Sequence, residues 1–328
     1  MPDMPHWAVP DPGQGQLSDF CYLYLMIKIL LTGANGLVGQ TLAGKIQLLH
    51  GFELLATSAS DCKVKGVEPV RFSIMDITSP DQVNTIFDRF KPDVVIHCAA
   101  LTQVDPCELN PDLCDKVNIE GTRLVAKAAE ESGARFIYLS TDFVFDGLNG
   151  PYSEDDQPNP VSVYGWSKLQ GEFITRSLKV PWIIVRTILV YGFTPSMSRF
   201  NMVTWVRDSL INHKPIRLVD DQFRMPTLVD DLADGIIRII KRDKTGIYHL
   251  SGPEMTSVLD FAVQTARFFN LDESLISPVH SDSLNQPGRR PVSTGFILEK
   301  AIGELDYAPR NLNQGLTEAR NLLSDYTV

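Results

Sequence analysis

The chain has 328 residues, an apolar fraction of 44% and a formal net charge of −10 at pH 7. This length can bury the core of one large α/β domain, or of one domain with a smaller lobe. The negative charge argues against nucleic acid or an anionic membrane as the main partner. The five cysteines lack metal-ligand spacing, so we expect free thiols, no metal site and a reducing, cytoplasmic setting.

The stretch before Met26 lacks the patterns of folded structure. Residues 1–19 are polar, rich in Pro and Gly and without periodicity, and residues 20–27 form an apolar run that leads directly into a strand. That run has neither the early positive charge nor the cleavage site of a signal peptide, and it is too short to span a membrane. We expect residues 1–25 to be dispensable, with Met26 as the natural start.

From Met26 onward, short β-rich runs alternate with amphipathic helices. The expected strands cover residues 27–32, 52–57, 69–73, 93–98, 135–140, 182–187 and 247–250. The expected helices cover residues 80–90, 118–132, 163–178, 228–242 and 256–270. This alternation predicts a Rossmann-type, doubly wound parallel sheet with helices on both faces. We expect an NAD(P)-binding core over 26–192 and a small substrate lobe over 193–328, interleaved with late core elements at 228–251.

A glycine-rich turn joins the strand at 27–32 to the helix that follows it. Its glycines have the spacing Gly33-x-x-Gly36-x-x-Gly39, one residue longer than the usual G-x-G-x-x-G form. Such a turn brings backbone N–H groups and a helix N-terminus to a pyrophosphate, although the glycines of a strand–helix junction often serve only a tight turn. The residues of this turn that we expect to contact a dinucleotide are Gly33, Asn35, Gly36, Leu37, Val38 and Gly39.

A second motif places Tyr164 and Lys168 four residues apart on a predicted helix. At this spacing both side chains lie on one face, where the ammonium group is expected to lower the pKa of the phenol and fit it for proton transfer. Alone, the pair is better explained as a surface Tyr and a solvated Lys. Thr141 changes that interpretation, because it follows the strand at 135–140 and lies where the nicotinamide end of a dinucleotide falls.

These motifs identify the chain as a member of a known family. Over residues 27–320 it resembles the extended short-chain dehydrogenase/reductases, and within them the dTDP-4-dehydrorhamnose reductase group. The segments that carry the resemblance are residues 139–147, 164–172, 186–192, 226–233 and 289–291. The resemblance implies that Thr141, Tyr164 and Lys168 catalyse reduction of the 4-keto group of a nucleotide-linked deoxy sugar, with dTDP-4-dehydro-L-rhamnose as the first candidate. Lys168 would also hold the nicotinamide ribose.

The resemblance also implies further cofactor contacts, each of which has a structural alternative. Asp76 and Ile77 match positions beside the adenine, although Asp76 can equally open a turn. Ala99 and Ala100 match small residues under the cofactor, or serve close packing. Asn118 matches an asparagine that helps a proton relay, or simply caps or crosses a helix.

The tip of the second strand, at Ser58, carries no carboxylate that would repel a 2′-phosphate. With Lys63 and Lys65 nearby, this favours NADPH, while Asp61 leaves NADH open.

On the substrate side, the resemblance implies contacts from Thr102, Val104, Asp105, Thr141, Asp142, Arg224 and Arg289. Arg289 and its neighbour Arg290 can hold a diphosphate by bidentate hydrogen bonds, or form a solvated pair before a proline. Two positions depart from the family pattern: Phe143 replaces a common Tyr, and Leu189 replaces a frequent Trp. Both positions are expected near the sugar, so these departures bear on which sugar is bound more than on the chemistry of its reduction.

Two other functions fit the same motifs. A nucleotide-sugar epimerase or another extended reductase shares the glycine turn and the Tyr–Lys pair. The regulatory subunit of methionine adenosyltransferase resembles the same group and binds a dinucleotide as a partner protein, without needing catalysis. The reductase remains the leading interpretation, so the expected partner is a nucleotide sugar, with a homodimer left open.

Overall fold

A computed structural model describes residues 26–65, 71–194, 196 and 199–326 of the chain. The expected extension at residues 1–25 lies outside the described residues. The expected strand at 69–73 lies partly outside them, and the strand that the structure describes here is Phe72–Ile74.

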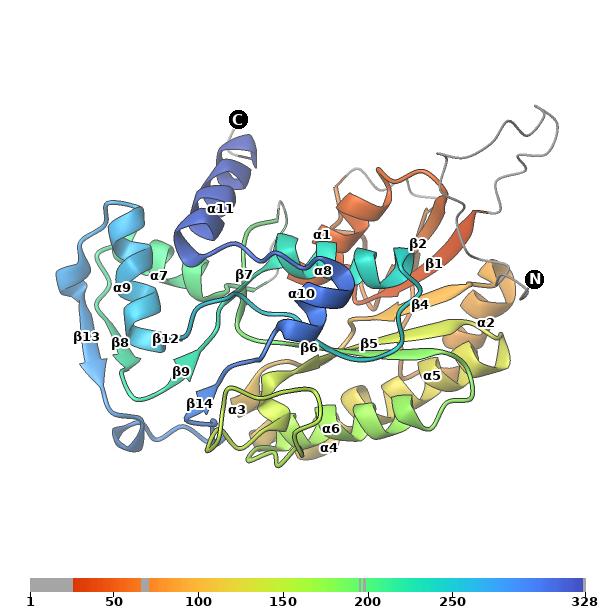
Figure 1. The fold of residues 1–328 in the computed structure, drawn as a ribbon, viewed down its shortest axis with the longest axis horizontal. Coiled ribbons are helices and arrows are strands. Elements are labelled where there is room, and N and C mark those ends of the chain that lie inside the picture. Colours follow the sequence, from red (N-terminus) through yellow and green to blue (C-terminus); the bar gives the residue numbers. More distant parts are fainter. Residues whose placement is uncertain (1–25, 66–70, 195, 197–198, 327–328) are drawn as a thin grey trace.

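The centre of the molecule is a seven-stranded, all-parallel sheet with the strand order β11-β6-β5-β4-β1-β2-β3 (Figure 1). Its strands are β1 Ile27–Thr32, β2 Phe52–Ser58, β3 Phe72–Ile74, β4 Val94–His97, β5 Arg135–Thr141, β6 Trp182–Thr187 and β11 Gly246–His249. The strand order reverses between β1 and β4, which is the switch point of a Rossmann-type fold. The predicted doubly wound α/β class is therefore confirmed.

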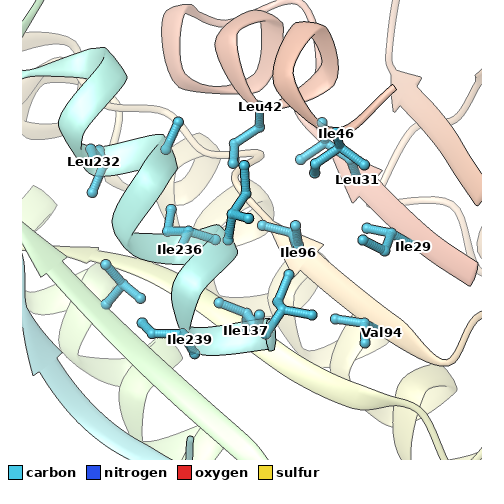
Figure 2. Close-up of a cluster of buried hydrophobic side chains, with 14 of the residues drawn as sticks. Ile29, Leu31, Leu42, Ile46, Val94, Ile96, Ile137, Leu232, Ile236 and Ile239 are labelled. Carbon is cyan, nitrogen blue, oxygen red and sulfur yellow. The ribbon is translucent and has the colours of Figure 1, made fainter. Parts of the chain in front are cut away.

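Helices cover both faces of this sheet. On one face lie α1 Leu37–Ile46, α8 Val229–Lys241 and α10 Glu299–Leu305; on the other lie α2 Pro80–Phe90, α5 Thr122–Glu131 and α6 Val163–Arg176 (Figure 1). Successive residues of β1 explain this arrangement, because Ile29 and Leu31 pack beneath α1 and α8 while Leu30 packs on the opposite side. Figure 2 shows the buried side chains between the sheet and the helices α1 and α8.

A smaller lobe is built from the chain after β6. Its strands are β7 Val190–Tyr191, β8 Ile216–Val219, β9 Phe223–Arg224, β10 Thr227–Leu228, β12 Thr256–Ser257, β13 Ile276–Val279 and β14 Ser293–Thr294. Its helices are α7 Met202–Ile211, α9 Val258–Phe268 and α11 Leu312–Tyr326. Between these elements the chain returns to the core as α8 and β11, so the lobe is interleaved with the sheet.

The helix expected over 118–132 is divided. Two short helices, α3 Val104–Leu109 and α4 Pro111–Asp115, lead into a π-helical stretch at Lys116–Gly121, and regular α-helix begins only at Thr122. Within the part of the chain that the structure describes, no helix is long and apolar enough to cross a membrane.

Candidate active site

A cleft of about 1060 Å³ lies at the carboxyl ends of the central strands, between the sheet and the smaller lobe. The sequence-predicted residues that line it are Gly33, Asn35, Gly36, Leu37, Val38, Gly39, Ser58, Asp76, Ile77, Ala99, Ala100, Thr102, Val104, Thr141, Asp142, Tyr164, Lys168 and Arg224. Three others, Asp105, Asn118 and Arg289, are not among its lining residues.

The three glycines of the first turn are needed for different reasons. Gly33 has φ +71°, and a Cβ there would lie 2.6 Å from the backbone nitrogen of Ala99. A Cβ on Gly39 would lie 2.3 Å from the Gly33 carbonyl oxygen, so neither position admits a side chain. Gly36 differs, because the nearest atom to its added Cβ is 3.3 Å away. Gly36 is the N-cap of α1 and faces the cleft, which leaves room and free N–H groups for a pyrophosphate.

Asn35 holds the loop that follows β2. Its side-chain amide donates to the carbonyl oxygens of Ser60 and Asp61, and its oxygen accepts from the backbone N–H of Lys63 at 2.9 Å. The loop therefore presents Ser58, Ser60 and Lys63 to the cleft.

Tyr164 lies in the first turn of α6. This helix begins at Ser162, whose hydroxyl accepts from the Gly165 N–H at 3.1 Å. The Tyr164 ring packs edge-on against the Phe143 ring, with 5.7 Å between their centroids, and only 7% of Tyr164 is exposed. Burial raises the pKa of Tyr164, and the hydrogen-bonding Thr141 hydroxyl acts in the opposite direction. The expectation of a lowered phenol pKa is thus wrong for the free protein. A protonated phenol is the form that can donate a proton.

Lys168 follows one turn later and is also buried. Its ammonium lies 4.1 Å from the centroid of the Tyr138 ring, and burial lowers the pKa of Lys168 to about 8. Among the described residues, no hydrogen bond to this ammonium is present, so its donors remain available to a ligand in the cleft.

The low pKa of Lys168 predicts a pH-dependent affinity for NADPH. A polyanionic ligand favours the ammonium form and raises its pKa on binding, so affinity should be constant below about pH 8. Above that value affinity should fall by at most about tenfold per pH unit, because one proton is involved. Fluorescence titration from pH 6.5 to 9.5 measures this, with Lys168→Met as a control that is weak at every pH. A flat wild-type profile would contradict the prediction.

A buried ion pair fixes α6 against the sheet. Glu172 on α6 receives a bidentate pair of hydrogen bonds from Arg186 on β6, at 2.9 and 2.7 Å. Ser140, which precedes Thr141, also donates to Glu172 at 2.6 Å. The helix that carries Tyr164 is thereby held on the strand that carries Thr141.

Asn118 lies in the π-helical stretch and is 1% exposed. Its amide accepts from the N–H of Leu101 at 2.8 Å and donates to the Leu101 carbonyl at 2.9 Å and to the Ser167 hydroxyl at 2.9 Å. The side chain therefore ties the loop after β4 to α6. It is not among the residues that line the cleft, and the cofactor contact expected of it stays a prediction.

The structure distinguishes the two neighbouring arginines of the late loop. Arg289 is exposed and outside the cleft lining, whereas Arg290 lines the cleft. Arg290 forms a bidentate ion pair with Asp105, at 2.9 and 2.8 Å. Of the two neighbouring arginines, Arg290 is thus the one at the cleft, and the substrate contacts expected of Asp105 and Arg289 stay predictions.

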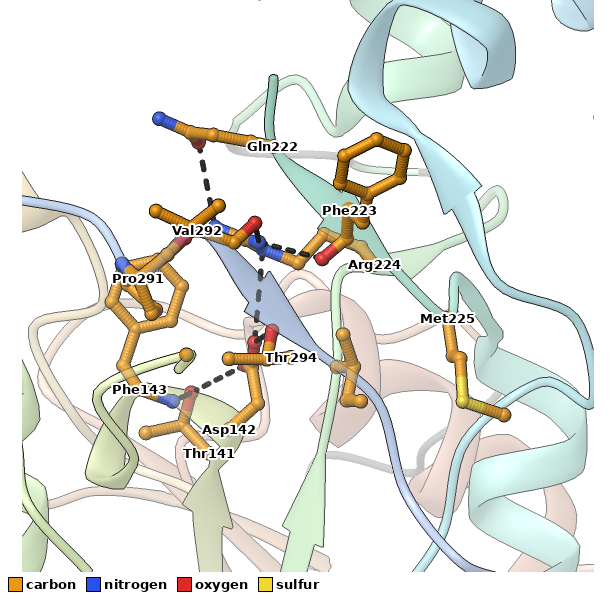
Figure 3. Close-up of polar contacts among 12 residues, drawn as sticks. Thr141, Asp142, Phe143, Gln222, Phe223, Arg224, Met225, Pro291, Val292 and Thr294 are labelled. Atoms are coloured by element: carbon orange, nitrogen blue, oxygen red, sulfur yellow. Dashed lines mark hydrogen bonds and ion pairs between the residues drawn. The ribbon is translucent and has the colours of Figure 1, made fainter. Parts of the chain in front are cut away.

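Arg224 reaches the cleft but is 4% exposed and held by protein groups (Figure 3). Its guanidinium donates to the carbonyl oxygens of Phe223, Pro291 and Val292, at 2.7, 2.7 and 3.1 Å. Most of its donors are therefore already used, which leaves little capacity for a substrate phosphate.

The sequence analysis missed most of the lobe's contribution to the cleft. The additional lining residues from this part of the chain include Arg199, Asn201, Trp205, Arg217, Gln222 and Gln286. No short motif marks them, since they are spread over residues 199–286, in loops, at α7 and on β8. Cys98, directly before Ala99, also lines the cleft, and burial raises the pKa of its thiol to about 12.

The Rossmann-type sheet and the cleft at its switch point are the fold and the site of the reductase class. The chain belongs to the RmlD substrate binding domain family, whose model matches residues 27–324. It is 36% identical over 246 residues to a dTDP-4-dehydrorhamnose reductase of Aggregatibacter actinomycetemcomitans, covering 73% of this chain and 78% of the relative. It is also 31% identical over 268 residues to methionine adenosyltransferase 2 subunit beta of Xenopus laevis, covering 80% and 78%.

Solved structures agree with this placement. A dTDP-4-dehydrorhamnose reductase from Clostridium acetobutylicum matches with a TM-score of 0.80 and 32% identity, over 90% of this chain and 99% of that one. One from Bacillus anthracis, solved in complex with NADP, matches with a TM-score of 0.76 and 28% identity, over 90% and 98%.

Proposed function

We propose that this protein reduces the 4-keto group of a nucleotide-linked deoxy sugar with NADPH or NADH. The preferred candidate reaction converts dTDP-4-dehydro-L-rhamnose to dTDP-L-rhamnose. The observation that carries the proposal is the convergence of Thr141, Tyr164 and Lys168 on one cleft beside the glycine turn. Membership of a reductase family supports it.

In the proposed mechanism the reduced nicotinamide, when bound, supplies hydride to the keto carbon. The Thr141 hydroxyl donates to the Asp142 carboxylate in the free protein; with substrate bound it turns this donor to the keto oxygen and orients that oxygen toward Tyr164. Tyr164 transfers its phenolic proton to that oxygen as negative charge develops there. Lys168 holds the nicotinamide ribose and stabilises the phenolate that remains.

The loop after β2 supports a preference for NADPH. Ser58, Ser60 and Lys63 line the cleft, while Asp61 does not. The Asp61 carbonyl is bound by Asn35, within a loop that offers hydroxyl groups and one cation at this end. Such a surface can accept a 2′-phosphate that a carboxylate would repel.

The nucleotide diphosphate is assigned to the lobe side of the cleft. Arg199 and Arg217 line it there, and no ion pair engages either of them among the described residues. They supply the local positive charge that a chain of net charge −10 does not supply globally.

An absorbance assay tests the proposal. Loss of the absorbance of the reduced nicotinamide should show that NADPH is oxidised as dTDP-4-dehydro-L-rhamnose is reduced, with slower oxidation of NADH. GDP- and UDP-linked keto sugars test the nucleotide. The relationship to methionine adenosyltransferase 2 subunit beta gives the second candidate, a dinucleotide-binding partner protein. No turnover of any keto sugar, together with stable co-purification with a methionine adenosyltransferase, would favour that second candidate.

A further inference from the structure

Asp142 is buried at the junction between the sheet and the lobe, and Figure 3 shows its contacts there. It directly follows Thr141 at the end of β5, and only 2% of it is exposed. Its Oδ1 accepts from the Thr141 hydroxyl at 3.1 Å. Its Oδ2 accepts from the Thr294 hydroxyl and lies 3.8 Å from Nε of Arg224. One carboxylate therefore contacts the catalytic strand end and two residues of the lobe.

The lobe contacts of Asp142 reach a small sheet rather than single loops. Thr294 on β14 and Arg224 on β9 are direct partners in the parallel pairing of these strands. Arg224 also binds the carbonyl oxygens of Pro291 and Val292, which lie directly before β14. These contacts join β9, β14 and the residues directly before β14 into one unit. Asp142 links this unit to Thr141 by hydrogen bonds and an ion pair.

Loss of a partner should destabilise the buried carboxylate of Asp142. A buried carboxylate needs hydrogen bonds or an opposite charge to offset its lost hydration. Burial raises the pKa of Asp142, and Arg224, Thr294 and Thr141 act against that rise. Removal of a lobe partner leaves the carboxylate less well satisfied and frees the lobe to shift.

We propose that Asp142 is a positioning residue that holds the substrate lobe, through Thr294 and Arg224, in register with Thr141. The inference rests on the proposed reduction of a nucleotide sugar. The glycine turn, Lys63 and Lys168 all belong to the sheet side of the cleft. Loosening the attachment should therefore impair use of the sugar and leave dinucleotide affinity intact.

Thr294 provides the sharpest test, because it is fully buried and does not line the cleft. An effect of Thr294→Val cannot come from a lost substrate contact. Loss of a hydrogen bond to a charged group predicts a fall of about tenfold or more in kcat/KM for the keto sugar. The NADPH dissociation constant should not change, and Thr294→Ser should restore wild-type kinetics.

Thr265→Val is the matched control. Thr265 is a fully buried lobe threonine whose hydroxyl donates within α9, to the Phe261 carbonyl at 2.8 Å. This variant should lose stability comparably without the kinetic defect. Equal kinetic losses in both valine variants would mean general loosening of the lobe and would overturn the proposal, as would a parallel loss of NADPH affinity in Thr294→Val.

Amide hydrogen exchange provides a readout independent of turnover. The N–H groups of Ser293 and Phe223 bind the carbonyls of Gly147 and Val292, at 3.1 and 2.8 Å. Both should exchange faster in Thr294→Val and at the wild-type rate in Thr265→Val. If the wild-type protein reduces no keto sugar, the proposed function fails, and exchange alone decides whether Asp142 holds the lobe. Unchanged exchange in Thr294→Val overturns the positioning role in either case.

Discussion

Replacing Tyr164 with Phe is expected to lower keto-sugar turnover by about a hundred- to ten-thousand-fold, the usual contribution of general acid catalysis. The change removes the hydroxyl that reaches the cleft beside Thr141 and keeps the ring. That ring packs against Phe143 and a small cluster containing Cys107 and Cys114. Folding and NADPH affinity should consequently be preserved.

Stopped-flow or steady-state absorbance at saturating NADPH measures the loss, and fluorescence titration measures cofactor affinity. Tyr307→Phe is the matched control. It also removes a buried hydroxyl, one that donates to the Ser251 carbonyl at 3.1 Å, but Tyr307 lies outside the cleft lining. Turnover by Tyr164→Phe equal to that of Tyr307→Phe would remove Tyr164 from the chemistry.

The sequence was most informative where a function depends on neighbouring residues of one element. The strand–turn–helix at Gly33 to Gly39 and the pairing of Tyr164 with Lys168 depend only on local geometry, and all four line one cleft. The parallel arrangement of the strands followed from alternation, because parallel strands need helical crossovers. These features require no knowledge of distant contacts.

The π-helical stretch at Lys116–Gly121 shows what local patterns miss. Its residues have ordinary helical character in the sequence, so one continuous helix was expected over 118–132. The Asn118 amide instead bonds both backbone groups of Leu101, 17 residues earlier, and such long-range contacts have no counterpart in helical periodicity. π-helical turns often occur near functional sites.

The arginines illustrate the same limit. Adjacent side chains in an extended loop point in different directions, so the pair at 289–290 could not reveal that Arg290 faces the cleft and Arg289 faces solvent. Arg224 was expected among the substrate contacts from its place just before the motif at 226–233. Its hydrogen bonds to carbonyl groups 67 and 68 residues away could not be inferred from that motif.

The second large effect is expected at Glu172, in the stability of the fold. Glu172 and Arg186 are 1% and 0% exposed and pair through two hydrogen bonds. Burial lowers the pKa of the adjacent His249, which keeps that imidazole neutral. Glu172→Gln leaves the Arg186 guanidinium buried without a counter-charge, which should reduce the free energy of unfolding by about 3–5 kcal/mol.

Urea unfolding followed by circular dichroism measures this loss, and two matched variants give it meaning. Glu131→Gln breaks a pair with Lys127 that is exposed on α5, and exposed pairs contribute at most about 1 kcal/mol. The double variant Glu172→Met with Arg186→Met replaces both charges by apolar groups, so it should be more stable than Glu172→Gln alone. If Glu172→Gln behaves like Glu131→Gln, the pair contributes little. If the double variant is less stable than Glu172→Gln, removing the unpaired charge of Arg186 has brought no gain. The loss of stability in Glu172→Gln would then come from lost hydrogen bonds rather than from an unpaired buried charge.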